Sequence, residues 1–300
     1  MLLRETGFLF ILTLTSAPSV QALTINIDFL EDGEPFHYAS ATAGGSDVAY
    51  APGTTVGGGL FEQAVSAAAQ SWEALIGDAA TLSVSVGWAP LTGSTLAVAT
   101  QSSIRNNASD GWVGDIRFDD GYTWFADPTP LQNEEYAVPE TLRYDMGGGE
   151  MITGLSFSGA AGAAYGAFDL FSVSLHEFGH LLGFTSIGND EFDDGEIDIL
   201  SGKFAGATLS LYGTGHMDPD DPRTSEALMV PAIASGERRL ISQADLAVTT
   251  QLGGFSDVKW EGVRAAGRSG TTVVPLPATV LGLGGGLAAL SLLSRRRRRP

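Results

Sequence analysis

The sequence predicts one mixed α/β (α+β) domain over residues 23–254. Hydrophobic residues make up 44% of the 300 residues, enough to bury a sizeable core, and 39 glycines favour many tight turns over long helices. Stretches that alternate apolar and polar residues, as strands do, are interspersed with stretches in which apolar residues recur at helical spacing. Strands and helices are therefore expected to follow one another within a single domain.

The first half of this domain predicts the order strand, helix, strand, strand. Leu23–Phe29 alternates apolar and polar residues, which is typical of a half-buried strand. Residues 61–76 carry apolar side chains at helical spacing, and Gly77 is placed to end that helix. Alternation returns at residues 82–88 and again at residues 96–98, so each of these stretches is expected to be a strand.

The second half adds strands, a loop and two helices. We expect a short strand at residues 114–118, a polar and aromatic loop at residues 119–130, and a further strand at residues 152–157. Asp169 is a good N-cap for a helix that runs to Leu182, and Ser242 begins a shorter helix that runs to Leu252.

Charge and cysteine content exclude several classes of function. The formal net charge of -19 repels nucleic acid and suits a protein that is exposed to the outside or to salt. The chain contains no cysteine, which excludes disulfides, thiolate metal sites and a cysteine nucleophile. Any bound metal must therefore be held by histidine, aspartate or glutamate.

The N-terminal segment, residues 1–22, has the pattern of a signal peptide. Arg4 precedes an apolar stretch over residues 8–14, and Val20-Gln21-Ala22 offers small residues where a signal peptidase cleaves. We expect cleavage after Ala22 and an exported mature protein. The alternative, a buried first helix, fits less well because the apolar run is short and a strand pattern follows at once.

The C-terminal end has the composition of a linker followed by a membrane anchor. Residues 255–273 read as a linker that contains Gly, Ser and Arg. Residues 274–300 combine Val-Pro-Leu-Pro, an apolar run over residues 278–293 and five arginines, Arg295 to Arg299. The apolar run is marginal for spanning a bilayer, and the arginines would hold its end on the cytoplasmic side.

This three-part tail resembles the PEP-CTERM sorting signals of Gram-negative bacteria, in a variant whose leading motif is Val-Pro-Leu-Pro. The resemblance implies that an exosortase-like transpeptidase removes the tail after a transient membrane stage. The protein would then reach the cell surface or the extracellular matrix. The alternative is a plain single-span anchor that stays attached.

The predicted helix at residues 169–182 carries a His-Glu-x-x-His pattern. His176 and His180 are four residues apart, so both imidazoles project from one face of the helix and can reach one ion. Glu177 lies beside them, where it can take a proton from a zinc-activated water. The alternative is a pair of core histidines. Histidine is scarce, since the chain contains only His37, His176, His180 and His216.

Three segments resemble the metzincin zinc peptidases. Residues 176–184 resemble the start of the extended metzincin zinc-binding motif. Ala227-Leu228-Met229-Val230-Pro231 resembles the Met-turn of the matrixin branch, and residues 241–246 resemble the start of its final helix. The resemblance implies a metzincin-like zincin with a twisted mixed sheet, an active-site helix, a Met-turn and a C-terminal helix.

The resemblance also implies two structural roles. Met229 would form a hydrophobic floor under the metal, although a methionine there can also be simple core filling. An upper edge strand, which we place at residues 116–118, would pair with an extended substrate.

The third metal ligand departs from the family pattern. The family position is occupied by Ser186, a poor zinc ligand at neutral pH. We predict that His216 is the third ligand, reached after an extra loop over residues 185–215, because it precedes Met229 as the family's third ligand precedes the Met-turn. The oxygen ligands Asp190, Asp198 and Glu226 remain alternatives, and His37 is expected to be an ordinary surface residue.

Residues 190–198 are rich in aspartate and glutamate. Carboxylates are the ligands that calcium prefers, so a Ca²⁺ site is conceivable, although the spacing does not match an EF-hand. The alternative is a solvated acidic loop.

These features predict a secreted or surface-displayed zinc endopeptidase that hydrolyses peptide bonds in protein or peptide substrates, with Glu177 as general base. One alternative is a catalytically inactive surface or matrix-binding protein that keeps the metalloprotease fold. Another is a different zinc hydrolase with an acidic third ligand. The presence of Glu177 favours an enzyme, because a purely structural zinc site does not require that carboxylate.

Overall fold

The computed structural model describes residues 22–44, 59–101 and 111–263. Residues 1–21 of the expected signal peptide, residues 264–273 of the expected linker and the expected sorting segment 274–300 lie outside the described residues. Within the described ranges, no helix is both long enough and apolar enough to cross a membrane.

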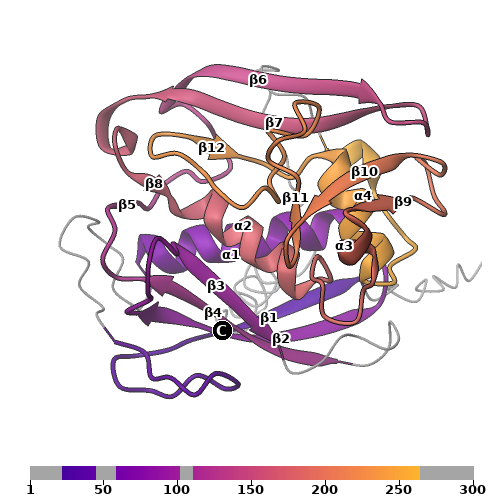
Figure 1. Cartoon of the computed structure of the whole chain (residues 1–300). Helices are drawn as coiled ribbons and strands as arrows, with labels where there is room; N and C mark the ends of the chain where they lie inside the picture. The colour runs from indigo at the N-terminus through magenta and orange to yellow at the C-terminus, as the bar shows by residue number, and fades with distance from the viewer. Residues whose placement is uncertain (1–21, 45–58, 102–110, 264–300) are drawn as a thin grey trace, which may run out of the picture.

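Two helices lie between a four-stranded sheet and a long β-hairpin (Figure 1). The strand order of the sheet is β1-β2-β4-β3, in which β1, β2 and β4 are parallel and β3 is antiparallel to β4. The elements of this layer are β1 (Leu23–Phe29), β2 (Ala80–Ala89), β3 (Ala97–Gln101), β4 (Trp112–Asp119) and the helix α1 (Leu60–Leu75). The chain is therefore a mixed α/β protein, as the sequence predicts.

Helix α1 joins the sheet to the rest of the core. Its buried face includes Phe61, Val65 and Trp72, which are the positions that the helical spacing predicts. Phe61 packs against Trp88 of β2 and Phe118 of β4, with ring centroids 4.8 and 5.7 Å away. The strands expected near residues 23–29, 82–88, 96–98 and 114–118 are also present.

Helix α2 (Leu170–Leu181) is buried on almost all sides and lies at the centre of the molecule (Figure 1). Asp169 caps its first turn by accepting a hydrogen bond from the Ser172 N–H. Gly183, at φ +126°, ends the helix, and a Cβ at this position would lie 2.6 Å from the backbone of Gly253. The helix predicted from Asp169 to Leu182 is thus confirmed.

A second, antiparallel sheet covers the other side of α2. Its strand order is β12-β7-β6, and it consists of β6 (Tyr136–Asp145), β7 (Glu150–Ala160) and β12 (Arg238–Arg239). Helix α4 (Gln243–Leu252) begins at the Ser242 cap and packs against β7. The sequence did not predict β6, because most of this edge strand is exposed and it contains Pro139, so it lacks clear alternation.

The segment expected as an extra loop, residues 185–215, contains regular structure. It folds with the residues that follow into the helix α3 (Glu191–Asp194) and a three-stranded antiparallel sheet of β9 (Glu196–Asp198), β10 (Thr208–Tyr212) and β11 (His216–Met217). The remaining elements are β5 (Trp124–Phe125), which pairs with β8 (Phe168–Asp169), and the 3-10 turns η1 (Gly162–Ala164) and η2 (Trp260–Gly262). β5 lies within the loop expected at residues 119–130.

The expectation that residues 116–118 form the edge strand is wrong. These residues lie in β4, which pairs with β2 on one side and with β3 on the other. Ile116 and Phe118 are fully buried, as suits an inner strand, whereas all five residues of β3 are half-buried. β3 is therefore the edge strand on this side of the sheet, and β1 is the edge strand on the opposite side.

Part of the expected linker packs on the domain. Val258 forms a β-bridge with Ile76, and Asp78 accepts hydrogen bonds from the backbone of Ser256 and Asp257. Phe255 and Val263 are buried. The folded unit therefore extends at least to Val263, beyond the boundary at residue 254 that composition indicates.

Candidate functional site

Three histidine side chains converge on one point. His176 and His180 project from α2, and His216 comes from the short strand β11. One ring nitrogen of each lies within 4.8 Å of the others, and the ring centroids are 4.7 to 5.3 Å apart. Among the residues that the structure describes, this is the only group of three or more His, Asp or Glu side chains with such a geometry.

The hydrogen bonds of these histidines suit metal binding. Nδ1 of His176 lies 2.9 Å from the carbonyl oxygen of Leu228, and Nδ1 of His180 lies 2.7 Å from that of Phe184. Because a carbonyl only accepts, each Nδ1 must carry the proton, which leaves each Nε2 with a free lone pair.

The two free lone pairs face each other, since the Nε2 atoms of His176 and His180 are 3.0 Å apart. Burial lowers the pKa of both rings, and the neighbouring His180 and His216 lower that of His176 further, so the rings are neutral. A cation between the nitrogens would remove this repulsion. Burial and the neighbouring His180 lower the pKa of His216 to about 3, so the third ring is neutral too. Three neutral imidazoles are suitable ligands for zinc. The residues present therefore fit a zinc ion.

Two tryptophans fix α2 next to the histidines that it carries. The indole N–H of Trp72 donates to the carbonyl of Leu175, at 2.9 Å, and that of Trp112 donates to the carbonyl of Leu181, at 2.8 Å. These carbonyls are adjacent in sequence to His176 and His180. The orientation of α2 is thus set by side chains from α1 and β4.

Met229 connects α2 to the strand that carries His216. It is fully buried, and its sulfur would lie 2.5 Å from a Cβ placed on Gly179, so the methionine packs directly on α2. Its carbonyl accepts a hydrogen bond from the Met217 N–H, at 2.8 Å. Substitution of Gly179 by any larger residue would therefore push Met229 away from the helix.

The backbone around Met229 is held by Asp245 of α4. The Asp245 carboxylate accepts hydrogen bonds from the N–H groups of Leu228, at 3.0 Å, and Met229, at 2.9 Å. The Leu228 carbonyl in turn faces Nδ1 of His176. Sequence reasoning missed this role, although the capping pattern of Ser242 and Asp245 at the start of α4 was visible.

Glu177 lies in the same cleft as the three histidines. The cleft has a volume of about 1070 Å³ and is lined by residues 94–101, including β3, as well as by Glu177 and the three imidazoles. Burial raises the pKa of Glu177 to about 8, while a hydrogen bond from the Ala99 N–H lowers it. The carboxylate thus stands between the histidines and the outer strand of the sheet.

The other residues considered as ligands lie outside the three-histidine group. Ser186 lines the cleft, but it is not part of the three-nitrogen group. Asp198 accepts a hydrogen bond from Thr208, Glu226 lies 3.9 Å from Arg239, and Asp190 precedes α3. None of these three carboxylates lines the cleft. His37 is half-exposed and pairs with Asp28, at 3.0 Å.

The acidic stretch, residues 190–198, forms α3 and β9. In the part of the chain that is described, no three of its carboxylates come together in the way that the three histidines do. Calcium binding there remains a prediction.

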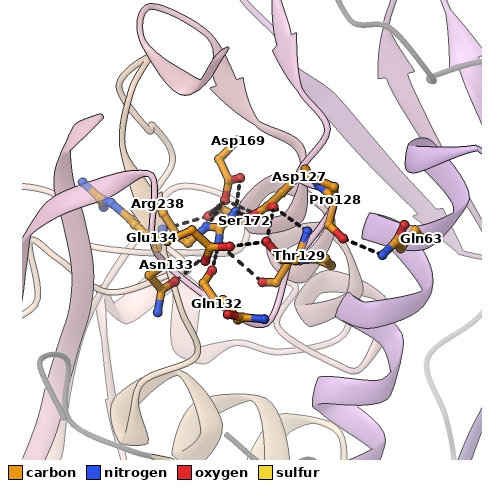
Figure 2. Close-up of polar contacts among 12 residues, drawn as sticks. Gln63, Asp127, Pro128, Thr129, Gln132, Asn133, Glu134, Asp169, Ser172 and Arg238 are labelled. Atoms are coloured by element: carbon orange, nitrogen blue, oxygen red, sulfur yellow. Dashed lines mark hydrogen bonds and ion pairs between the residues drawn. The ribbon is translucent and has the colours of Figure 1, made fainter. Parts of the chain in front are cut away.

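A buried ion-pair network fixes the start of α2 (Figure 2). The guanidinium of Arg238 lies 2.7 Å from Asp127 and 2.7 Å from Asp169, and all three side chains are fully buried. Asp169 also caps α2 through Ser172. Burial lowers the pKa of Arg238, but its anionic and hydrogen-bonding partners, Asp169 first and then Tyr136 and Asp127, outweigh that effect and raise it. The sequence pattern predicted the cap but not its arginine partner.

We expect His216→Ala to weaken zinc binding. Loss of a partner that only orients a ligand costs about 10–100-fold in metal affinity, and loss of a direct ligand should cost at least as much. Zinc affinity, measured by competition with a chromogenic chelator, tests this. The matched control is His37→Ala, since His37 pairs with Asp28 outside the cleft. Equal zinc affinity in the two variants would remove His216 from the ligand set.

The arrangement combines three neutral imidazoles with one buried carboxylate at an open cleft. It can hold a divalent cation and move a proton beside it. No protein-family model matches the sequence, and no curated protein matches it, so any functional conclusion depends on the site itself.

Proposed function

We propose that the protein is a secreted zinc-dependent endopeptidase of the metzincin type. The observation that carries the proposal is the convergence of His176, His180 and His216 in the cleft that also contains Glu177. The pattern of two histidines one helical turn apart with an intervening glutamate is typical of zinc peptidases. An imidazole from β11 would supply the third ligand in place of Ser186.

Two further features support the metzincin type. Met229 packs on Gly179 of α2, which lies between the two helical histidines in sequence, and this position suits the hydrophobic floor that the resemblance implies. The turn at residues 227–231 is followed by the capped helix α4, in the order that the resemblance implies. Both features involve the residues that carry the resemblance.

A bound zinc ion would supply a Lewis acid that polarises the scissile carbonyl and makes a water molecule more acidic. Glu177 would accept a proton from the attacking water and pass it to the leaving amine. Within the described residues β3 pairs only with β4, so its outer backbone groups, apart from the Ala99 N–H that donates to Glu177, can pair with an extended peptide in the cleft. The peptide would then lie across the three histidines.

We also propose export through the signal peptide at residues 1–22 and surface display through the tail at residues 274–300. An exosortase-like transpeptidase would process that tail. The substrates would therefore be proteins outside the cell.

The direct test is zinc content together with casein hydrolysis by the purified protein, before and after treatment with a metal chelator. We expect about one zinc per chain, hydrolysis that stops on zinc removal, and recovery when zinc is added back. Bound zinc without hydrolysis of casein or of a mixed peptide library would favour the inactive binding protein. Hydrolysis that survives complete zinc removal would exclude the proposed mechanism.

A further inference from the structure

A second cavity lies outside the cleft, along the sheet of β12, β7 and β6. It has a volume of about 620 Å³, within the range of about 300–1,000 Å³ that is typical of small-ligand sites. Its walls come from β6, β7, the residues after η1 and residues 234–239. Arg239 lines both spaces, but the three histidines and Glu177 line only the cleft.

Three strands place a carboxylate, a hydroxyl and a guanidinium side by side in this second cavity. Glu140 of β6 is paired directly with Ser156 of β7, and Ser156 is paired directly with Arg239 of β12. Side chains at directly paired positions lie on the same face of a sheet, with Cβ atoms about 4.5–5.5 Å apart. All three residues line the cavity. The row therefore offers an acceptor, a group that both donates and accepts, and a donor.

Two polar groups of this row have no hydrogen-bond partner within the described residues. The Ser156 hydroxyl has none, although Ser156 is only 4% exposed. Nε and Nη1 of Arg239 donate to other parts of the protein, whereas its Nη2 makes no hydrogen bond and lies 3.9 Å from Glu226. Buried polar groups are normally hydrogen-bonded. Their position at the wall of a cavity therefore indicates a polar ligand.

An aromatic side chain stands at the rim of the second cavity. Tyr165 lines the cavity and is 80% exposed. It directly follows η1, and Gly166, at φ +73°, turns the chain after it. Gly236 lies against this turn, since a Cβ on it would be 3.7 Å from the backbone nitrogen of Gly166. An exposed ring at this place can pack on the apolar C–H face of a ligand.

The lining of the second cavity disfavours several classes of ligand. In the part of the chain that is described, only the three histidines have the spacing of metal ligands, so the carboxylates of this cavity are not arranged for a divalent cation. Three carboxylates against one guanidinium repel an anion, and the only aliphatic side chains are alanines, which do not suit an apolar ligand. An organic cation would lie beside Arg239, whose charge already pairs with Glu237, at 2.6 Å.

We propose that the second cavity binds a neutral oligosaccharide. Sugar hydroxyls both donate and accept hydrogen bonds, so they match a row of acceptor, hydroxyl and donor. They would donate to Glu140, exchange hydrogen bonds with Ser156 and accept from Nη2 of Arg239, while one sugar ring packs on Tyr165. The inference goes beyond the proposed endopeptidase function and does not depend on it, because no proposed zinc ligand or general base lines this cavity.

The test screens the purified protein for binding to an array of neutral, acidic and cationic amino oligosaccharides. Isothermal titration calorimetry with the neutral oligosaccharide that gives the strongest signal then measures Kd. We expect neutral oligosaccharides to be preferred. Ser156→Ala and Tyr165→Ala should each weaken binding by about 2- to 10-fold, the contribution of one hydrogen bond or of one aromatic contact. Because the Ser156 hydroxyl has no partner in the described protein, Ser156→Ala should unfold at the wild-type temperature.

Tyr144→Ala is the matched control, since Tyr144 is an exposed tyrosine of β6 that does not line the cavity. It should keep wild-type affinity, as should the wild type after removal of zinc. Absence of binding to neutral oligosaccharides, or stronger binding of acidic or cationic ones, would overturn the proposal. Wild-type affinity in both Ser156→Ala and Tyr165→Ala would overturn it as well. A wild type that binds the oligosaccharide but hydrolyses no peptide would support this inference and remove the proposed function.

Discussion

Glu177→Gln is expected to reduce peptidase kcat by about 10²–10⁴-fold, the usual contribution of a general base. Glu177 is the only carboxylate among the described residues that line the cleft, so no neighbour can replace it. Glutamine has the same shape and can still accept the hydrogen bond from Ala99, so the fold and the histidines should be unaffected. Peptide hydrolysis under saturating substrate, with zinc content measured on the same sample, gives the comparison.

Glu150→Gln is the matched control, because Glu150 is exposed at the start of β7, outside the cleft. It should behave like the wild type in both measurements. If Glu177→Gln keeps zinc and unfolds at the wild-type temperature but also keeps wild-type kcat, Glu177 is not the base. If it loses zinc instead, the Glu177 carboxylate contributes to zinc binding, and its role is not limited to that of a general base.

The sequence predicts those parts of the site whose structure depends only on neighbouring residues in the chain. Asp169 and Gly183 mark the two ends of α2, and the spacing of His176 and His180 follows from the helical repeat alone. The face of α1 that packs on the sheet can likewise be predicted from the spacing of its apolar residues. In each case the information lies within one turn or one helix of the residue concerned.

The contacts between distant segments could not be predicted in the same way. His216 was inferred from its order in the chain, but its position depends on the hairpin that joins β10 to β11. The hydrogen bonds that Asp245 accepts from the N–H groups of Leu228 and Met229 join residues 17 and 16 positions apart, and the path of the chain between them cannot be predicted from local sequence. The sequence placed the edge strand at residues 116–118 and not at β3, because the sequence of a short strand does not reveal which strands it pairs with.

Arg238→Met is expected to lower the free energy of unfolding by about 3–5 kcal/mol, the cost of breaking a buried ion pair by removal of one partner. Methionine replaces the volume of the stem but leaves Asp127 and Asp169 charged and fully buried. Asp169 would still cap α2, but without the cation that compensates its charge (Figure 2). Urea unfolding of the zinc-free protein, followed by circular dichroism, measures the change without a contribution from metal binding.

Lys203→Met is the control for loss of an ion pair at the surface. Lys203 lies 3.1 Å from Glu261, both side chains are exposed, and such pairs contribute about 0–1 kcal/mol. Adding Asp127→Asn and Asp169→Asn to Arg238→Met removes the unpaired charges, so this triple variant should recover part of the lost stability. If Arg238→Met and Lys203→Met cost the same, the buried network does not stabilise the start of α2. Since α2 carries two of the three histidines, a large loss at Arg238 would show that an ion pair outside the cleft stabilises the domain at the start of the helix that carries the candidate metal ligands.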